Sequence, residues 1–131
     1  MKLSTRYGWA GIGGLSLLTL VHWFREVGAV RPPIADHLLG SGPNFAAAIA
    51  ITFVPFSIWA DQQRDITHAS AVRAFVVCAA ISGVGLVCWE LFQRTSANFV
   101  FDYHDLIATF VGLAFAGLLF VALTRQESGN G

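Results

Sequence analysis

The chain has 131 residues, of which 55% are hydrophobic and only 12% are charged, and its formal net charge at pH 7 is zero. A soluble domain normally carries about 25% charged residues, so we expect most of this surface to face something less polar than water. The zero net charge disfavours a nucleic-acid-binding protein, because no basic excess is present to neutralise phosphates.

Four apolar runs follow one another along the chain, at residues 8–24, 44–60, 72–92 and 105–124. The fourth contains 19 consecutive residues without a charge, from Leu106 to Thr124. A helix of that length spans about 28 Å, close to the hydrocarbon thickness of a bilayer. We therefore predict an all-α membrane protein, a four-transmembrane-helix bundle forming one domain over residues 1–124. The polar tail at 125–131 is predicted to be disordered.

The first two runs raise questions of detail. The first resembles a secretory signal, since Lys2 and Arg6 precede it and small residues follow it, but we expect it to be retained as a helix. Between the first two runs, Pro32, Pro33 and several glycines predict a structured connector, with a short interfacial helix at 35–40. Pro55 is expected to kink the second run by removing one backbone hydrogen bond.

The basic residues favour one orientation in the membrane. If four helices cross, both termini and the loop near residues 61–71 share a side, which holds five basic residues against three on the other. The five are Lys2, Arg6, Arg64, Arg73 and Arg125; the three are Arg25, Arg31 and Arg94. The positive-inside rule then predicts cytoplasmic termini, and we expect a multi-pass protein of the bacterial inner membrane.

Acidic residues gather near the connection between the third and fourth runs. Glu90 and Gln93 are three residues apart on one helical face, and Asp102 and Asp105 precede the fourth run. These four residues are our candidate ligand-binding site, opening on the outer side. A structural explanation is also open: Asp105 would cap the fourth helix, and Glu90 would extend to the membrane interface.

Histidines on the same side suggest metal or haem chemistry only weakly. His22 and His104 would both lie at outer helix ends. Two histidines on facing helices can serve as the axial ligands of a b-type haem. A zinc site from Asp36, His37 and His104 lacks a recognisable ligand spacing. We therefore expect no cofactor and no metal, and a protein that is more plausibly a binding protein than an enzyme.

Small residues recur every four positions in three of the runs. Such spacing lets helix backbones approach closely in lipid, where van der Waals packing replaces the hydrophobic effect. We expect these residues to pack helices within the chain, with contact to another membrane subunit as the alternative. They are Ala10 and Gly14; Ala79 and Gly83; and Ala108, Gly112 and Ala116.

The acidic motifs resemble those of the VanZ-like family of small membrane proteins. That family has a Glu-x-x-Gln pattern closing the third helix and an Asp-x-x-Asp pattern opening the fourth, matched here by Glu90, Gln93, Asp102 and Asp105. The segment from Asp36 to Phe45 is similar to the family's entry into its second helix, and Thr109 stands where the family has asparagine. The resemblance implies a bundle of about four transmembrane helices that acts at the bacterial envelope.

Two functions from different classes follow. The first is a VanZ-like inner-membrane protein that binds an envelope or lipid-linked ligand at its outer face. The second is a non-catalytic accessory subunit of a larger membrane complex, whose partners would be the lipid bilayer and other membrane subunits.

Overall fold

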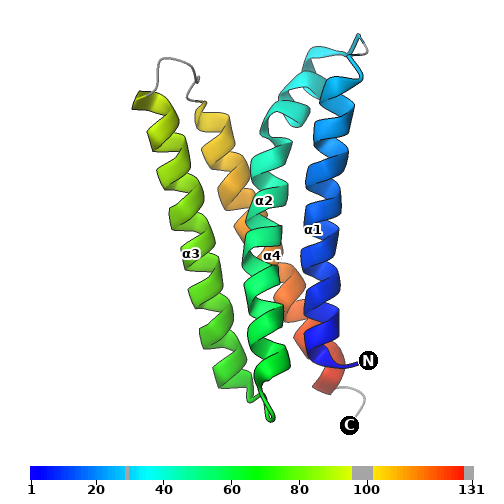
Figure 1. Ribbon diagram of the computed structural model, residues 1–131, viewed down its shortest axis with the longest axis vertical. Helices are drawn as coiled ribbons and strands as arrows, with labels where there is room; N and C mark the ends of the chain where they lie inside the picture. The colour runs from blue at the N-terminus through cyan, green and yellow to red at the C-terminus, as the bar shows by residue number, and fades with distance from the viewer. Residues whose placement is uncertain (29, 96–101, 129–131) are drawn as a thin grey trace.

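Four α-helices make up the secondary structure in the computed structural model, which describes residues 1–28, 30–95 and 102–128. They are α1 (Leu3–Glu26), α2 (Pro33–Gln62), α3 (His68–Thr95) and α4 (Tyr103–Ser128) (Figure 1). The start of α1, the end of α4 and the α2–α3 turn lie at one end of the bundle, and the end of α1, the start of α2, the end of α3 and the start of α4 lie at the other. This up-and-down order confirms the all-helical prediction.

Three helices are long and apolar enough to cross a membrane by length and composition. They are α2, α3 and the Tyr103–Arg125 part of α4. Helix α1 is also long, at 24 residues, but His22 and its glycines make it less apolar than the other three helices. The chain therefore has the helices of a membrane protein.

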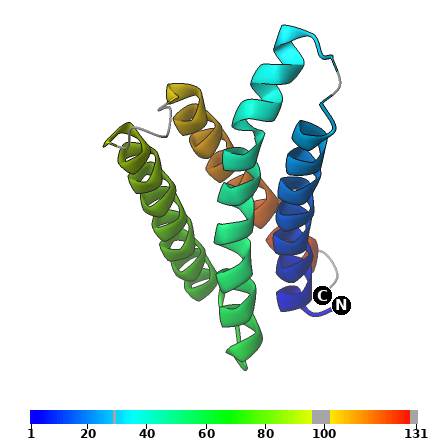
Figure 2. The ribbon, with the colours of Figure 1, turned by 45° about the horizontal axis from the view of Figure 1, so that its top comes forward.

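Helix α2 begins earlier than the sequence predicted. The segment expected to be a connector with a short interfacial helix is the first part of α2, with Pro33 in its first turn and Pro43 inside it. Proline is tolerated in the first turn, because the N–H that it lacks has no partner inside a helix there. The first part of α2 runs at an angle to the rest of the helix (Figure 2), as expected of a helix with proline inside it.

Helix α4 is also longer than predicted. It continues to Ser128, so the first residues of the tail expected to be disordered are helical, while residues 129–131 lie outside the described residues. At the other end, the polar linker that separates the two acidic motifs falls partly at 96–101, which the structure does not describe.

Helix α2 is the centre of the bundle, because each of the other three packs against it. The contacts are closest at glycines. A Cβ on Gly14 would lie 2.8 Å from the Ala50 backbone, and one on Gly112 would lie 2.7 Å from the Phe45 carbonyl oxygen. Between α3 and α4, a Cβ on Gly83 would lie 2.9 Å from Leu113. The predicted role of these glycines in helix packing is thus seen within the chain.

The other small residues of the pattern differ in burial. Ala116 is fully buried in the core, while Ala10 and Ala79 are partly buried against it. Ala108 is also partly buried. Because these residues pack within one chain, their spacing gives no separate support for a partner subunit.

The terminal half of the bundle is held by aromatic rings. Phe120 of α4 stacks on Phe75 of α3 with centroids 4.4 Å apart, and Tyr7 of α1 lies 4.5 Å from Phe56 of α2. The Tyr7 hydroxyl is 2.9 Å from the Thr124 hydroxyl. All four helices therefore meet at this end.

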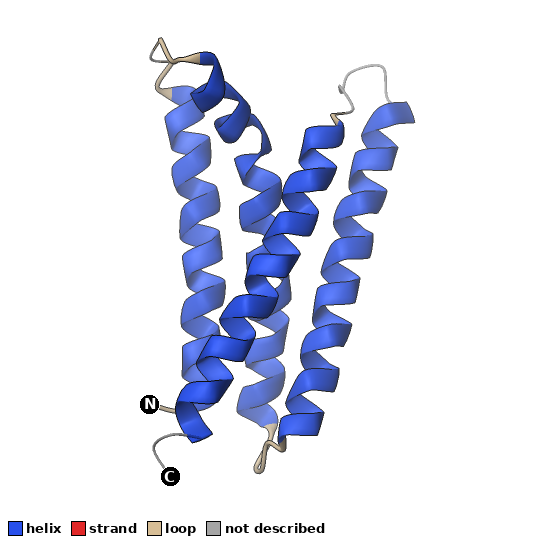
Figure 3. Cartoon of the chain, turned by 180° about the vertical axis from the view of Figure 1, so that it is seen from behind, coloured by secondary structure: helices blue, strands red, loops and turns tan. Residues whose placement is uncertain are grey.

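Toward the opposite end the arrangement opens. Seen from behind, α4 crosses the bundle obliquely, from beside α1 at the terminal end to beside α3 at the other (Figure 3). The oblique crossing leaves α1 and α4 apart near the connections, with α2 between them.

Candidate functional site

The candidate site lies at the end of the bundle away from the termini, where α3 ends and α4 begins. The sequence placed Glu90, Gln93, Asp102 and Asp105 together there. The structure divides them into two groups: Glu90 and Gln93 in a buried contact with α2, and Asp102 at the exposed start of α4.

Glu90 is the most deeply buried charged residue among those described, with 1% of its surface exposed. Its Oε1 accepts a hydrogen bond from Asn44 Nδ2 of α2 at 2.8 Å and a longer contact, 3.5 Å, from Gln93 Nε2. Its Oε2 is buried and has no hydrogen-bond partner within the described part of the chain. One half of this carboxyl is therefore satisfied by protein and the other half is not. The structural explanation expected the Glu90 side chain to extend to the membrane interface, and the buried position of Glu90 shows that it does not.

Asp102, rather than Asp105, caps α4. Its Oδ1 accepts a hydrogen bond from the His104 backbone N–H at 2.9 Å and lies 2.7 Å from the His104 ring Nδ1. This is the geometry of a helix N-cap, in which a side-chain oxygen accepts from a free N–H of the first turn. These hydrogen bonds from His104 hold the pKa of Asp102 below its ordinary value.

Asp105 is the third residue of α4 and is half-buried. Its carboxyl is close enough to Glu90 and to Asp102 for the negative charges to repel, and Arg25 and His104 act in the opposite sense. The backbone carbonyl of Asp105 accepts a hydrogen bond from the Thr109 hydroxyl at 2.9 Å. Asp105 thus links the exposed and buried acids electrostatically.

The structure adds one residue that the sequence did not indicate, Asn44, and it brings together two histidines that the sequence had considered for a zinc site. Asn44 was assigned to the edge of a connector, and its contact with Glu90 joins residues 46 positions apart. His37 of α2 lies beside His104, with ring centroids 5.9 Å apart. No spacing along the chain signals either pair, because both depend on α2 starting at Pro33.

An apolar groove opens at the same end, between α1, α2 and α4. Its volume is about 460 Å³, and His104 and Ser41 are the polar residues in its lining. His22 is exposed and takes no part in it. Among the described residues, no group of three or more histidine, cysteine or acidic side chains could hold a metal ion.

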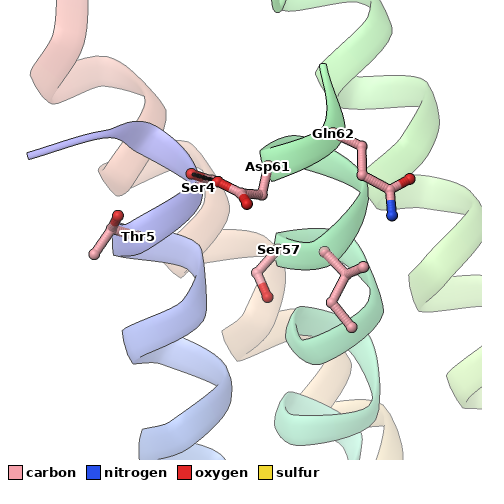
Figure 4. Close-up of a pocket in the computed structure, with 6 residues that line it drawn as sticks. Ser4, Thr5, Ser57, Asp61 and Gln62 are labelled. Atoms are coloured by element: carbon pink, nitrogen blue, oxygen red, sulfur yellow. Dashed lines mark hydrogen bonds between the residues drawn. The ribbon is translucent and has the colours of Figure 1, made fainter. Parts of the chain in front are cut away.

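A polar hollow lies at the terminal end, formed by the start of α1 and the end of α2 (Figure 4). Its volume is about 320 Å³, and it is lined by Ser4, Thr5, Ser57, Ile58, Asp61 and Gln62. The Ser4 hydroxyl donates to Asp61 Oδ1 at 3.1 Å, as the dashed line in Figure 4 marks. Because its polar groups bond one another across two helix ends, we assign this hollow to helix docking.

No family model, curated protein or solved structure matches this chain. The VanZ-like resemblance accordingly remains an expectation from short motifs. The geometry of the two acidic groups and the groove carries the functional argument that follows.

Proposed function

We propose that this chain is a VanZ-like protein of the bacterial inner membrane that binds an envelope or lipid-linked ligand at the outer end of its bundle. In this proposal the chain crosses the membrane four times, with both termini in the cytoplasm. The ligand presents a hydrogen-bond donor to the buried Glu90, which Gln93 contacts, and lies near Asp102 and Asp105 at the start of α4.

The unpartnered Oε2 of Glu90 is the observation that carries the proposal. A buried acceptor without a donor costs about 1–3 kcal/mol, so most proteins do not retain one. Ionisable groups at membrane depth are usually functional. A donor on a bound ligand would remove this cost, and Asn44 and Gln93 would hold the carboxyl in place for it.

The packing of α1 supports four crossings. Gly11 and Gly14 bring α1 against Val54 and Ala50, so α1 runs beside α2 through the bundle rather than across its end. A helix in this position spans the same depth as the helix that it contacts.

Single-cysteine labelling tests the topology. In a variant with Cys78 and Cys88 replaced by alanine, Val30→Cys should react with a membrane-impermeant maleimide on intact spheroplasts. Gln63→Cys should react only after lysis. Reaction of both positions on the same side would rule out four crossings.

Native mass spectrometry of gently extracted protein tests the binding site. The unmodified protein should retain a bound small molecule, and Glu90→Gln combined with Asp105→Asn should lose it while remaining folded. Glu26→Gln is the control, because it removes an exposed carboxylate at the same end of the bundle. Retention by the double variant, or an empty unmodified protein, would contradict the proposal.

A further inference from the structure

The groove between α1, α2 and α4 has the shape and chemistry of a site for a hydrocarbon chain. Its walls are Leu17 and Val21 of α1 and Ile107 and Val111 of α4, its floor includes Phe45 of α2, and His104 lies at one end. The oblique course of α4 produces it, since α1 and α4 move apart toward this end (Figure 3). A volume of about 460 Å³ is within the usual range for small-molecule sites.

The groove is short enough to lie within one leaflet of a bilayer. Along α4 it runs from His104 to Val111, a rise of about 10 Å at 1.5 Å per residue. The hydrocarbon core of a bilayer is about 30 Å thick. With the four crossings proposed above, a groove of this length fits within one leaflet, which is about 15 Å thick.

Charges near the open end select the head group. The helix ends on this side carry five carboxylates and three guanidinium groups. The acids are Glu26, Asp36, Glu90, Asp102 and Asp105, and the bases are Arg25, Arg31 and Arg94. Glu90 is buried in the contact between α2 and α3, and Asp36 lies 4.0 Å from Arg31, so Asp102 is the acid best placed to meet a head group. The capping bonds from His104 keep Asp102 in its ionised form, directly beside the groove. An acidic end favours a ligand with positive charge.

We propose that this groove holds the alkyl chain of an amphiphile whose head group carries an ammonium group. The ammonium group lies at the acidic end beside Asp102 and His104. This inference rests on the proposed function and names the chemical class of its ligand.

Photo-crosslinking in nanodiscs tests the inference with two defined probes. One is phosphatidylethanolamine with a diazirine on its acyl chain, and the other is phosphatidylglycerol with the same chain. We expect the amine-bearing probe to label peptides containing residues 17–21 and 104–111, at least threefold more strongly than the other probe. Equal labelling by the two probes would overturn the choice of an ammonium head group.

Filling the groove should prevent labelling. Ala108→Phe places a ring in the groove, whereas Ala114→Phe places the same ring on an exposed part of α4. From the opposite wall, Leu17→Trp fills the groove, and Leu20→Trp is its exposed control. We expect each groove variant to lose at least three-quarters of the labelling and each control to keep it. Equal labelling of a folded groove variant and its control would overturn the inference.

The double variant Glu90→Gln with Asp105→Asn separates this inference from the proposed function. If the groove variants lose labelling and the double variant keeps it, the groove is correct and the assignment of Glu90 is wrong. If the double variant loses its bound molecule while the groove variants label normally, the proposed function stands and the groove inference fails.

Discussion

Asn44 Nδ2 donates a hydrogen bond to Glu90 Oε1 at 2.8 Å, joining the first half of α2 to the last turns of α3. Because Glu90 is almost completely buried, this bond replaces water that the carboxyl has lost.

Asn44→Ala should lower the free energy of unfolding by about 1–3 kcal/mol, the usual cost of leaving a buried acceptor without its donor. Unfolding in mixed detergent–SDS micelles measures the change. Gln93→Ala should cost less, because its contact with Glu90 is longer. In a Glu90→Ala background the effect of Asn44→Ala should largely vanish, and a persistent effect would show that Asn44 acts elsewhere.

Gly112→Ala should lower the free energy of unfolding by about 1–3 kcal/mol, since its added Cβ meets the Phe45 carbonyl oxygen and forces α4 away from α2. Gly117→Ala is the matched control on the same helix, where a Cβ meets nothing within 4 Å. Its stability should be unchanged or higher, because alanine favours a helix. Similar losses in both variants would mean that α4 does not pack as described.

A second glycine pair tests the position of α1. Gly14→Ala should separate α1 from α2, because the new Cβ lies 2.8 Å from the Ala50 backbone, whereas Gly13→Ala meets nothing within 4 Å. We expect a loss of about 1–3 kcal/mol for the first variant and none for the second. Disulfide crosslinking between cysteines placed on α1 and α2 gives an independent readout, and it should weaken only in Gly14→Ala.

Tyr7→Phe should lower the free energy of unfolding by about 0.5–1.5 kcal/mol. The Thr124 hydroxyl donates to the Phe120 carbonyl at 2.7 Å, so in the 2.9 Å contact with Tyr7 the tyrosine hydroxyl is the donor. Removing it leaves the Thr124 oxygen without that donor in the aromatic core. The same substitution in a Thr124→Val background should cost clearly less, which the same unfolding assay can show.

Acidification should weaken the start of α4. The pKa of Asp102 is lower in the folded chain than in the unfolded one because of its bonds from His104. The contribution of Asp102 to the free energy of unfolding is therefore fully present above the pKa of the unfolded chain, about 3.9. It is lost as the pH falls through the lower pKa of the folded chain. Unfolding measured from pH 6 down to pH 3 should show a smaller decline in Asp102→Asn than in the unmodified chain. An identical decline would exclude Asp102 as the cause.

Composition and pattern were sufficient for the coarse architecture. The long uncharged run from Leu106 to Thr124 can satisfy its backbone only as a helix in an apolar setting, so its length and type follow from local physics. The same holds for the glycines at 14, 83 and 112. Each lies four positions after an alanine, and this spacing predicts a face for close helix packing, whichever helix packs against it. The number of helices also predicted which segments lie at the same end, because an even number of antiparallel helices brings both chain ends to one side of the bundle.

The tertiary structure alone decided which side chains meet. The start of α2 at Pro33 brings Asn44 to Glu90 and His37 to His104. The sequence had predicted that this helix begins only at residue 44, because prolines and glycines usually interrupt helices. The oblique crossing of α4 opened the groove beside His104. Both outcomes depend on helix axes and on packing across long separations in the chain, which local preferences do not determine.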